Sequence, residues 1–506
     1  MPSSHASSSA VLPAASNLKR LTLPTLSADV VHLLYATALC TAVLFAFIIV
    51  SPDVRHWFVV PVLICGVLVG ADAMGLVTGA RDIFDPIGMI GLFGLHFFFL
   101  APLLHVYWDY WIDDVQGPAD WRVWLGLMAV LNATGLLLYR WARAGTRRPT
   151  RPAPVPDRRW GICRVRFGLS LAFLLVVTAI LQFWIYSLYG GITGYIEVAS
   201  EGRDAFRNMG AVFVVSESFP MLALIGFAVY GADSRRARSL LVVVAVMLLF
   251  LVLRFFFGGL RGSRSTIVWS LFWAVGVMHL WLRALPRRVL LVGIGLLIAF
   301  MYFYGLYKGA GRDVIDILQR GGGITDLQEK ARRPIESTVL GDLARSDVQA
   351  HLLYRSMAAS DADFAWGRTY LGAAALLVPQ FIWPDRVTGK IQAGTDFQYG
   401  SGSYALGRFE SLRVYGLAGE ALINFGPLAV PLSYVVLGLL VRWVRRFASQ
   451  LHEQDTRVLL LPMLVSLCVT MVVSDADNMV FFVAQNGIMP FLLLLSGRRT
   501  VVVARA

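Results

Sequence analysis

The residues with the clearest chemical potential form a short turn of glycines, arginines and hydroxyl side chains, GGLRGSRST at 258–266. Glycines let the backbone approach a ligand closely, and paired arginines beside hydroxyls at the start of a helix suit an anion. The turn therefore predicts a phosphate or diphosphate site at Arg261 and Arg264. The alternative is an ordinary turn whose arginines meet lipid headgroups.

Two charges lie within apolar segments just before this turn. Arg254 interrupts LVLRFFFGG, and Glu217 lies in VVSESFP. A charge inside a membrane helix costs a few kcal/mol or more, so it usually has a partner or a function. Arg254 therefore either pairs with Glu217 or contributes to the phosphate site. Further arginines are expected on the same face and are candidate ligands of the same anion: Arg203, Arg207, Arg312, Arg320, Arg345, Arg408 and Arg413.

Candidate proton acceptors lie near Arg413, the last of these arginines. Glu410 and Glu420 flank Arg413, and the three share a broad face if 410–424 is helical. A carboxylate there can orient or deprotonate a hydroxyl, or it can hold a loop to a helix end. His351 is a further candidate base, although its spacing from neighbouring apolar residues also fits a packed histidine.

Two Asp-x-Asp strings, Asp361-Ala362-Asp363 and Asp475-Ala476-Asp477, resemble carboxylate pairs that bind divalent ions. Such a string is short, and Asp475 also stands where a helix start favours an acid. We expect no metal, because so short a pattern arises easily by chance, and no cofactor, since the sequence has no nucleotide-binding glycine motif.

Composition indicates what positions these residues. Of 506 residues, 57% are hydrophobic and 15% are charged, against about 25% charged in a soluble domain. The chain is therefore predicted to be an all-α polytopic membrane protein. The net charge of +13 is explained by arginines in short loops on one side, so nucleic acid is not an expected partner. The four cysteines, Cys40, Cys65, Cys163 and Cys468, indicate neither a disulfide framework nor a zinc site.

About twelve membrane-spanning helices are predicted from the apolar runs. They lie near 30–50, 57–79, 83–106, 121–141, 167–189, 211–230, 239–258, 265–282, 289–307, 414–441, 458–473 and 478–496. Residues 1–29 are expected to be a disordered cytoplasmic tail, and 497–506 are expected to be a cytoplasmic tail. The first nine spans occupy 30–307, a long outer loop with short helices occupies 308–413, and three more spans occupy 414–496.

Arginine placement predicts the orientation. Basic clusters at 140–166, 235–238, 287–288, 442–446 and 498–499 alternate with acidic YWDYWIDDVQGPAD and the long loop. By the positive-inside rule, both termini are expected to be cytoplasmic and the long loop to lie on the outer face of the membrane. The apolar stretch from Tyr370 to Trp383 is about 14 residues long and is expected to be re-entrant or interfacial.

Three features of residues 190–440 resemble the Wzy-type oligosaccharide repeat-unit (O-antigen) polymerases. They are the turn GGLRGSRS, the stretch GRTYLGAAALLVPQFIWPDR and the segment GLAGEALINFG, in which Glu420 precedes Asn424, Phe425 and Gly426. The resemblance implies an integral-membrane glycosyltransferase of a bacterial inner (plasma) membrane. Such an enzyme moves a growing glycan from polyprenyl diphosphate onto another lipid-linked repeat unit.

The resemblance also assigns roles and partners. Arg254, Arg261 and Arg264 are expected to bind the donor diphosphate, and Tyr370, Trp383 and Asn424 to shape a glycan site. Glu420 or Glu410 is expected to orient the acceptor hydroxyl. The expected partners are a polyprenyl-diphosphate-linked oligosaccharide as donor and acceptor, membrane lipid and a chain-length regulator protein. The alternatives are an O-antigen ligase or other lipid-carrier glycosyltransferase, and a transporter of lipid-linked sugars.

Overall fold

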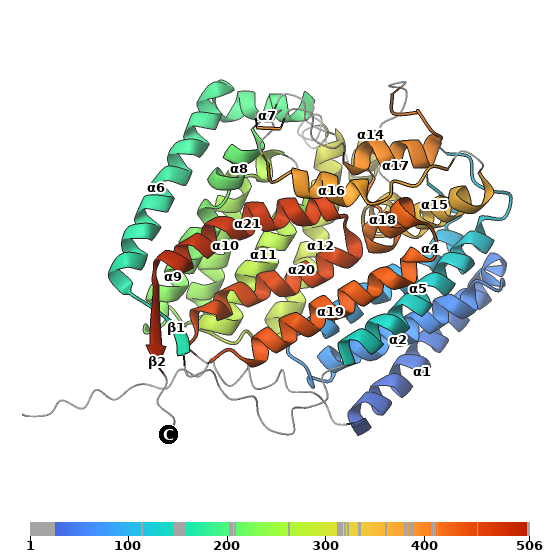
Figure 1. Ribbon diagram of the computed structural model, residues 1–506, viewed down its shortest axis with the longest axis horizontal. Helices are drawn as coiled ribbons and strands as arrows, with labels where there is room; N and C mark the ends of the chain where they lie inside the picture. Colours follow the sequence, from blue (N-terminus) through green and yellow to red (C-terminus); the bar gives the residue numbers. More distant parts are fainter. Residues whose placement is uncertain are drawn as a thin grey trace, which may run out of the picture.

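The structure is a bundle of helices with one short β-ribbon (Figure 1). The computed structural model describes residues 26–112, 115–144, 158–201, 206, 209–261, 264–310, 317, 320, 323–331, 335–359, 362–378, 382–383, 389–405, 411, 413–452 and 454–502. Within these ranges the chain is mostly helical, which confirms the predicted all-α membrane class at that level.

The helices of the first part of the chain are α1 (Leu26–Val50), α2 (Val59–Val77), α3 (Pro86–Gly94), α4 (Ala101–Tyr107), α5 (Trp121–Ala144), α6 (Arg164–Leu188), α7 (Gly191–Glu201), α8 (Gly210–Ser216), α9 (Phe219–Gly231), α10 (Leu240–Phe256), α11 (Arg264–Val277) and α12 (Arg287–Ala310). Those of the second part are α14 (Ile324–Ala331), α15 (Ser346–Ala358), α16 (Arg368–Ala375), α17 (Lys390–Tyr399), α18 (Gly416–Phe425), α19 (Ala429–Ser449), α20 (Leu461–Val473) and α21 (Ala476–Ser496). Single 3₁₀ or π turns occupy Pro52–Val54, Leu95–Leu100, Gly259–Arg261, Met278–Leu282, Ser337–Asp342 and Thr456–Leu460.

Eight helical segments within the described residues are long and apolar enough to cross a membrane. They are Asp29–Val50, Val59–Val77, Pro86–Tyr107, Trp121–Ala144, Arg164–Leu188, Gly210–Gly231, Thr456–Val473 and Ala476–Ser496. All eight coincide with predicted spans. Capping explains some of their starts: the Asp85 side chain accepts a 2.9 Å hydrogen bond from the Ile87 amide, and Pro86 follows at the first helical position.

The other four predicted spans correspond to shorter, broken or more polar helices. The apolar helices Leu240–Phe256 and Thr266–Leu282 are 10–17 residues long, and α12 occupies the position predicted for 289–307. The segment 414–441, predicted as one span, is divided into α18 and α19. The break lies at Gly426, whose φ of +82° favours glycine, and at Pro427, which disrupts a continuing helix.

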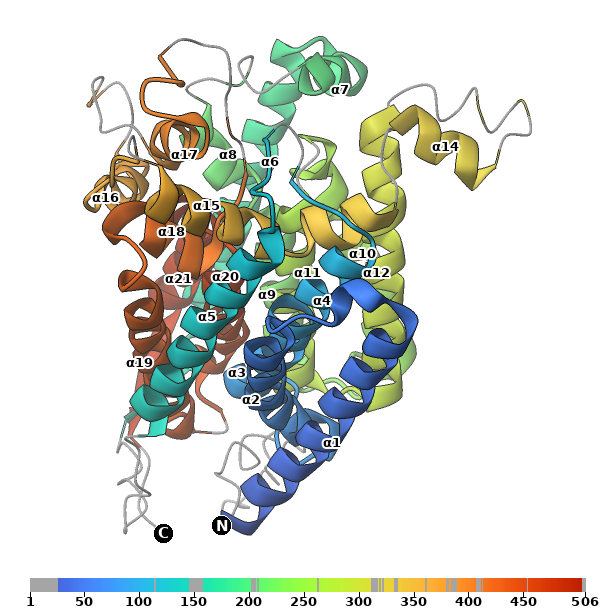
Figure 2. The same cartoon turned by 90° about the vertical axis from the view of Figure 1, so that its right-hand side faces the viewer.

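The connections lie on two opposite faces of the bundle. We call the face that carries α14, α15, α16 and α17 the loop face. The opposite face, where α1 begins and the β-ribbon lies, we call the basic face (Figures 1 and 2). The loops at 77–85, 231–239 and 283–287 belong to the basic face. Which of the two faces is cytoplasmic stays a prediction from arginine placement.

Helix α20 lies at the centre of the bundle. It contacts α3, α11, α18, α19 and α21. Around it, one apolar cluster joins α2, α3, α5, α15, α18 and α19, and a second joins α6, α9, α10, α11 and α21. Buried Val465, Cys468 and Val469 on α20 belong to the first cluster and Met463 to the second. The loop-face helix α18 is therefore seated directly on the membrane core.

A two-stranded antiparallel ribbon joins distant parts of the chain on the basic face. Strand β1 (Arg158–Ile162) pairs with β2 (Arg498–Val502), and Arg158 lies opposite Val502. The amide of Cys163 continues the pairing with a 2.8 Å hydrogen bond to the Gly497 carbonyl. The ribbon thereby connects the start of α6 to the end of α21.

Candidate functional site

The carboxylate of Glu420 is the meeting point of three helices on the loop face. Its Oε1 accepts a 2.7 Å hydrogen bond from the Thr369 hydroxyl of α16, and its Oε2 accepts one of 2.7 Å from the Ala476 amide of α21. The Glu420 side chain lies on α18 and only 3% of the residue is exposed. A carboxylate has about four lone-pair positions, so these two donors leave acceptor capacity for a further hydroxyl.

Asp475 anchors the start of α18 and a buried lysine at the same place. Its Oδ1 accepts hydrogen bonds of 2.8 Å from the amides of Tyr415 and Gly416, which begin α18. Its Oδ2 accepts a hydrogen bond from the ammonium group of Lys390, which also lies 3.6 Å from Asp477. Lys390 and Asp475 are both buried. We call Thr369, Lys390, Glu420, Asn424, Asp475 and Asp477 the Glu420 network.

The charges in this network shift each other's protonation. Burial, together with the negative charge of Asp475, raises the pKa of Glu420 above its ordinary value of 4.5, although the hydrogen bonds from Thr369 and Ala476 oppose the shift. Burial alone lowers the pKa of Lys390, but the charges of Asp475 and Asp477 outweigh it and raise that pKa. Two carboxyl groups, those of Asp475 and Asp477, thus contact the ammonium group, and Glu420 with its raised pKa accepts a proton closer to neutral pH than an ordinary glutamate does.

Asn424 extends the network to a strained turn. Its Nδ2 donates to the Thr369 hydroxyl at 2.7 Å, and its Oδ1 accepts from the Gly367 amide at 2.9 Å. The Asn424 carbonyl accepts a 3.0 Å hydrogen bond from the Trp366 amide. Trp366 has a φ of +46°, which costs a non-glycine residue of order 1–3 kcal/mol. The surrounding hydrogen bonds hold the turn in this conformation.

The strained turn presents an aromatic surface to the exterior. Trp366 is 73% exposed and Phe425 is 49% exposed, whereas Tyr370 is partly buried. The Tyr370 and Phe425 rings are stacked with centroids 6.3 Å apart, and the Trp366 ring stands nearly at right angles to Phe425 at 6.4 Å. We call Trp366, Tyr370 and Phe425 the aromatic ledge. Through Asn424 and Thr369, the ledge is bonded to the Glu420 network.

Arg254 is buried inside the bundle and pairs with Glu217. Its Nη1 donates to the carbonyls of Glu217 at 2.7 Å and Phe257 at 3.4 Å, and its Nη2 lies 3.7 Å from Glu217 Oε2. The side-chain amide of Gln485 donates to the same Oε2. Of the two interpretations of Arg254, the contacts match the buried pair. Because Phe257 ends α10, the pair also fixes the turn that leads to Arg261.

The described backbone of the predicted phosphate turn, 258–261 and 264–266, lies between the end of α10 and the start of α11 on the loop face. Arg261 ends the short turn Gly259–Arg261, and Arg264 begins α11. The side chains of both arginines lie outside what the structure describes. Other predicted site residues lie wholly outside the described residues: Arg203, Arg207, Arg408 and Glu410.

The predicted helix through 410–424 begins later than expected. Arg413 lies before α18, which starts at Gly416 because Asp475 caps its first amides. Arg413 and Glu420 therefore do not share one helix face.

The apolar stretch from Tyr370 to Trp383 includes most of α16, which is about 12 Å long and so too short to cross a membrane of about 30 Å. Trp383 at its end is 43% exposed.

His351 lies in the middle of α15, and Arg345 immediately precedes the helix. The His351 ring is buried, its Nε2 lies 3.2 Å from the Gln398 carbonyl, and burial lowers its pKa. These are the contacts of the packed histidine that the sequence also allows. Arg345 precedes α15 and donates to the carbonyls of Gly341, at 3.3 Å, and Ala344. Neither residue has a described contact with the Glu420 network.

Both carboxylates of the Asp475-Ala476-Asp477 string contact the ammonium group of Lys390. Across the described residues, no three histidine, cysteine or acidic side chains are grouped so that they can hold a metal ion. Asp361 of the other string lies outside those residues.

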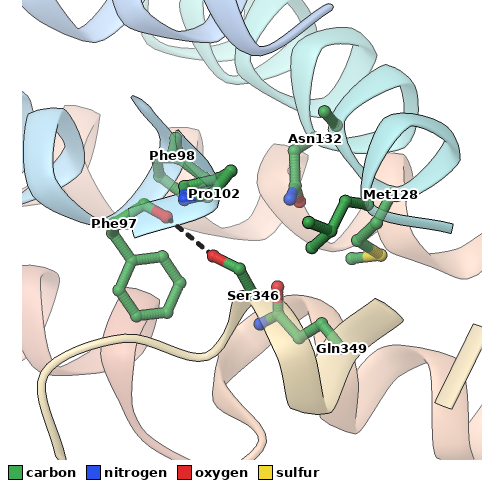
Figure 3. A pocket seen from close by; sticks show the side chains of 9 residues that line it. Phe97, Phe98, Pro102, Met128, Asn132, Ser346 and Gln349 are labelled. Atoms are coloured by element: carbon green, nitrogen blue, oxygen red, sulfur yellow. Dashed lines mark hydrogen bonds between the residues drawn. The ribbon is translucent and has the colours of Figure 1, made fainter. Parts of the chain in front are cut away.

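A small cavity lies between α5, α15 and the turn Leu95–Leu100 (Figure 3). Asn132, Ser346 and Gln349 supply its polar edge, and the Ser346 hydroxyl donates to the Phe97 carbonyl at 3.5 Å. About 10 Å³ is open to the centre of a water molecule, which is room for about one water. A sugar does not fit there, so the cavity is no substrate site.

Sequence reasoning found Glu420, Asn424 and Tyr370 but missed Lys390, Thr369 and Trp366. Lys390 follows Gly389 at the start of a short helix, where nothing local distinguishes it from a solvated lysine. Asp475 did carry a signal for a structural role, since an acid between two apolar helices can cap the start of a helix. Pairing it with Lys390 requires the tertiary fold.

No protein-family model, no curated protein and no solved structure matches this chain.

Proposed function

We propose that this chain polymerises oligosaccharide repeat units carried on polyprenyl diphosphate. The observation that carries the proposal is the bonding of an exposed aromatic ledge to a buried carboxyl group whose pKa is raised. Aromatic faces provide stacking surfaces for sugar rings, and a carboxylate with a raised pKa suits removal of a hydroxyl proton. The sequence resemblance supports the same reaction at the same residues.

In this proposal the acceptor hydroxyl attacks the anomeric carbon of the donor sugar. A new carbon–oxygen bond forms as the bond from that carbon to the diphosphate oxygen breaks. The breaking bond's electron pair leaves with the polyprenyl diphosphate, and the hydroxyl proton passes to Glu420. The reaction needs no oxidant, nucleotide or further reactant.

The residues of the network take distinct roles. Glu420 contacts the acceptor hydroxyl through its remaining lone pairs. Thr369 and the Ala476 amide fix the direction of the carboxylate, while Lys390 and Asp475 hold α17, α18 and α21 together around it. Arg261 and Arg264 are assigned to the diphosphate, where guanidinium groups stabilise the charge that develops on the leaving oxygen. Arg254 supports that turn from inside the bundle.

The test uses purified protein in nanodiscs with a defined polyprenyl-diphosphate repeat unit and no nucleotide sugar. Products are separated by chain length, with and without a chelator. A ladder that persists with the chelator and disappears in Glu420→Gln supports the proposal, and Glu329→Gln on exposed α14 is the matched control. A single transfer to an added lipid A core acceptor, without a ladder, indicates a ligase instead. A normal ladder from Glu420→Gln rules out the assigned base.

A further inference from the structure

Three arginines surround one buried carboxylate on the basic face, far from the Glu420 network. Asp72 Oδ1 accepts hydrogen bonds from Arg140 at 2.9 Å and from Arg143 at 2.7 Å, and Oδ2 accepts a second from Arg143 at 2.7 Å. Arg81 approaches the same carboxylate at 3.9 Å. Asp72 lies on α2, and Arg140 and Arg143 lie near the end of α5. One buried negative charge is thus shared among three positive groups.

The Arg81 side chain packs against α2 beside this carboxylate. A side chain at Gly75 would lie 2.9 Å from Arg81 Cδ, so the glycine makes room for the arginine to lie against α2. Arg81 is 8% exposed, and its guanidinium donates to the Asp72 carbonyl at 3.2 Å. Its nearest other acidic group, Asp29, is 3.7 Å away and 57% exposed.

Two buried donors of this cluster point to a missing acceptor. Arg81 Nε and Arg140 Nε are buried N–H donors and have no hydrogen-bond partner among the described residues. His32 on α1 is not such a donor, because its Nε2 donates to the Thr78 hydroxyl at 3.0 Å, a hydroxyl that itself donates to the Met74 carbonyl. Buried N–H groups without acceptors cost about 1–3 kcal/mol each, so an anion at this place is favoured.

Charge and position define the anion. The three arginines carry three positive charges, against the buried Asp72 and the mostly exposed Asp29. The cluster lies where α1 and α2 reach the basic face, and α1 exposes Leu33 and Leu34 beside it, as a lipid-facing helix does. Guanidinium groups bind phosphate oxygens in pairs, and basic sites between helices at this depth suit lipid headgroups.

We propose that Arg81, Arg140 and Arg143 form a binding site for one phosphate group at the basic face. The site is independent of the proposed glycosyl transfer. Its phosphate source is either the lipid headgroup or free phosphate in solution, and the experiment separates them.

The experiment measures the thermal unfolding midpoint of the full chain in nonionic detergent. Dioleoyl phosphatidylglycerol, dioleoyl phosphatidylcholine or inorganic phosphate is added over a concentration series. Phosphatidylglycerol is expected to raise the midpoint in a saturable way, while phosphatidylcholine does not. If inorganic phosphate alone gives the same saturable rise, the phosphate site stands and its source is soluble. Equal effects of both lipids overturn the proposal.

Variants locate the effect. Arg81→Gln is expected to weaken phosphatidylglycerol binding about tenfold or more, the usual consequence of losing a hydrogen bond to a charged group. Arg164→Gln removes the same charge from the same face, outside the cluster, and is expected to leave binding unchanged. Arg140→Gln, whose side chain is 29% exposed, replaces Arg81→Gln if that variant does not fold. Asp72→Asn, which removes the competing carboxylate, is expected to tighten binding. Unchanged lipid binding in the folded arginine variants overturns the proposal.

Discussion

Glu420 on α18 and Ala476 at the start of α21 are joined by a 2.7 Å hydrogen bond from the amide to the carboxylate. The first turn of the last membrane helix therefore directs the carboxylate that we assign to the acceptor hydroxyl. Because Asp475, the preceding residue, caps α18 and binds Lys390, one short connection sets both the position and the charge of the site.

Replacing Glu420 with glutamine is expected to reduce the rate of chain growth by about 10²- to 10⁴-fold, the usual contribution of a general base. Glutamine keeps an oxygen for the Ala476 amide, so the fold is expected to survive. The initial rate of ladder formation and the elution of the purified variant measure these two effects. Loss of the folded protein together with activity would assign Glu420 to structure alone.

The pH–rate profile is expected to respond in opposite directions to two neighbouring variants. Deprotonated Glu420 is the active form, so the rate rises with pH through its pKa. Lys390→Gln removes a positive charge, raises that pKa further and moves the rise to higher pH. Asp475→Asn removes a negative charge and moves it to lower pH. Profiles that shift together, or not at all, contradict the electrostatic assignment.

Stability is expected to fall as pH rises because of the same carboxyl group. A carboxyl group whose pKa is higher in the folded state binds more protons there than in the unfolded chain. Its stabilising contribution is present below the ordinary value of 4.5 and is lost as pH rises through the raised value. Thermal unfolding across this window measures the loss, and Glu420→Gln is expected to remove that part of the pH dependence.

Trp366→Gly is expected to separate stability from glycan binding. Glycine adopts the φ of +46° without the strain that tryptophan carries, so the relieved strain favours the folded state by about 1 kcal/mol. Loss of the ring from the aromatic ledge is expected to raise KM more than it lowers kcat. The control is Trp443→Ala, which removes an exposed tryptophan of α19 outside the ledge. An unchanged KM for Trp366→Gly would exclude the ledge from substrate binding.

The Arg254–Glu217 pair is expected to behave as one unit. Removing either partner alone, as Arg254→Met or Glu217→Gln, leaves a buried charge uncompensated and costs about 3–5 kcal/mol. The double variant is expected to recover part of that loss in thermal unfolding. If the double variant folds and keeps its activity, Arg254 has a structural role only. If it folds but is inactive, Arg254 is instead assigned to diphosphate binding.

The sequence predicted the membrane helices well because their signal is local. The eight candidate spans depend on length and apolar composition, which any window of the chain reports. The break between α18 and α19 also has a local signal, the Gly426-Pro427 pair. It was missed because the run from 414 to 441 is apolar on both sides of that pair. The number of spans beyond eight stays a prediction.

The site was only partly predictable, for a physical reason. Glu420, Asn424 and Tyr370 were found through a motif that lies on one stretch of chain. Lys390 and Thr369 become part of the site only when α16 and α17 pack against α18 and α21, and the positive φ of Trp366 has no composition signal. Arg254 illustrates the converse. Its position in an apolar run predicted a partner or a function, but only the fold shows that it contacts Glu217 and Phe257 and that Gln485 binds the same Glu217 carboxylate.

The β-ribbon gives the protein an order of assembly. Strand β1 is synthesised long before β2, and at about 5–20 residues per second its partner follows some tens of seconds later. During that interval α6 is in the membrane, but its end on the basic face has no strand to hold it. Until then the start of α6 is held on this face by its contacts with α9 and the residues that follow it, among them the Arg164–Asp233 ion pair and the hydrogen bond from the Tyr230 hydroxyl to the Arg164 carbonyl. A ribosome that stops shortly before Arg498 therefore releases a protein with every membrane helix made and the ribbon still unformed.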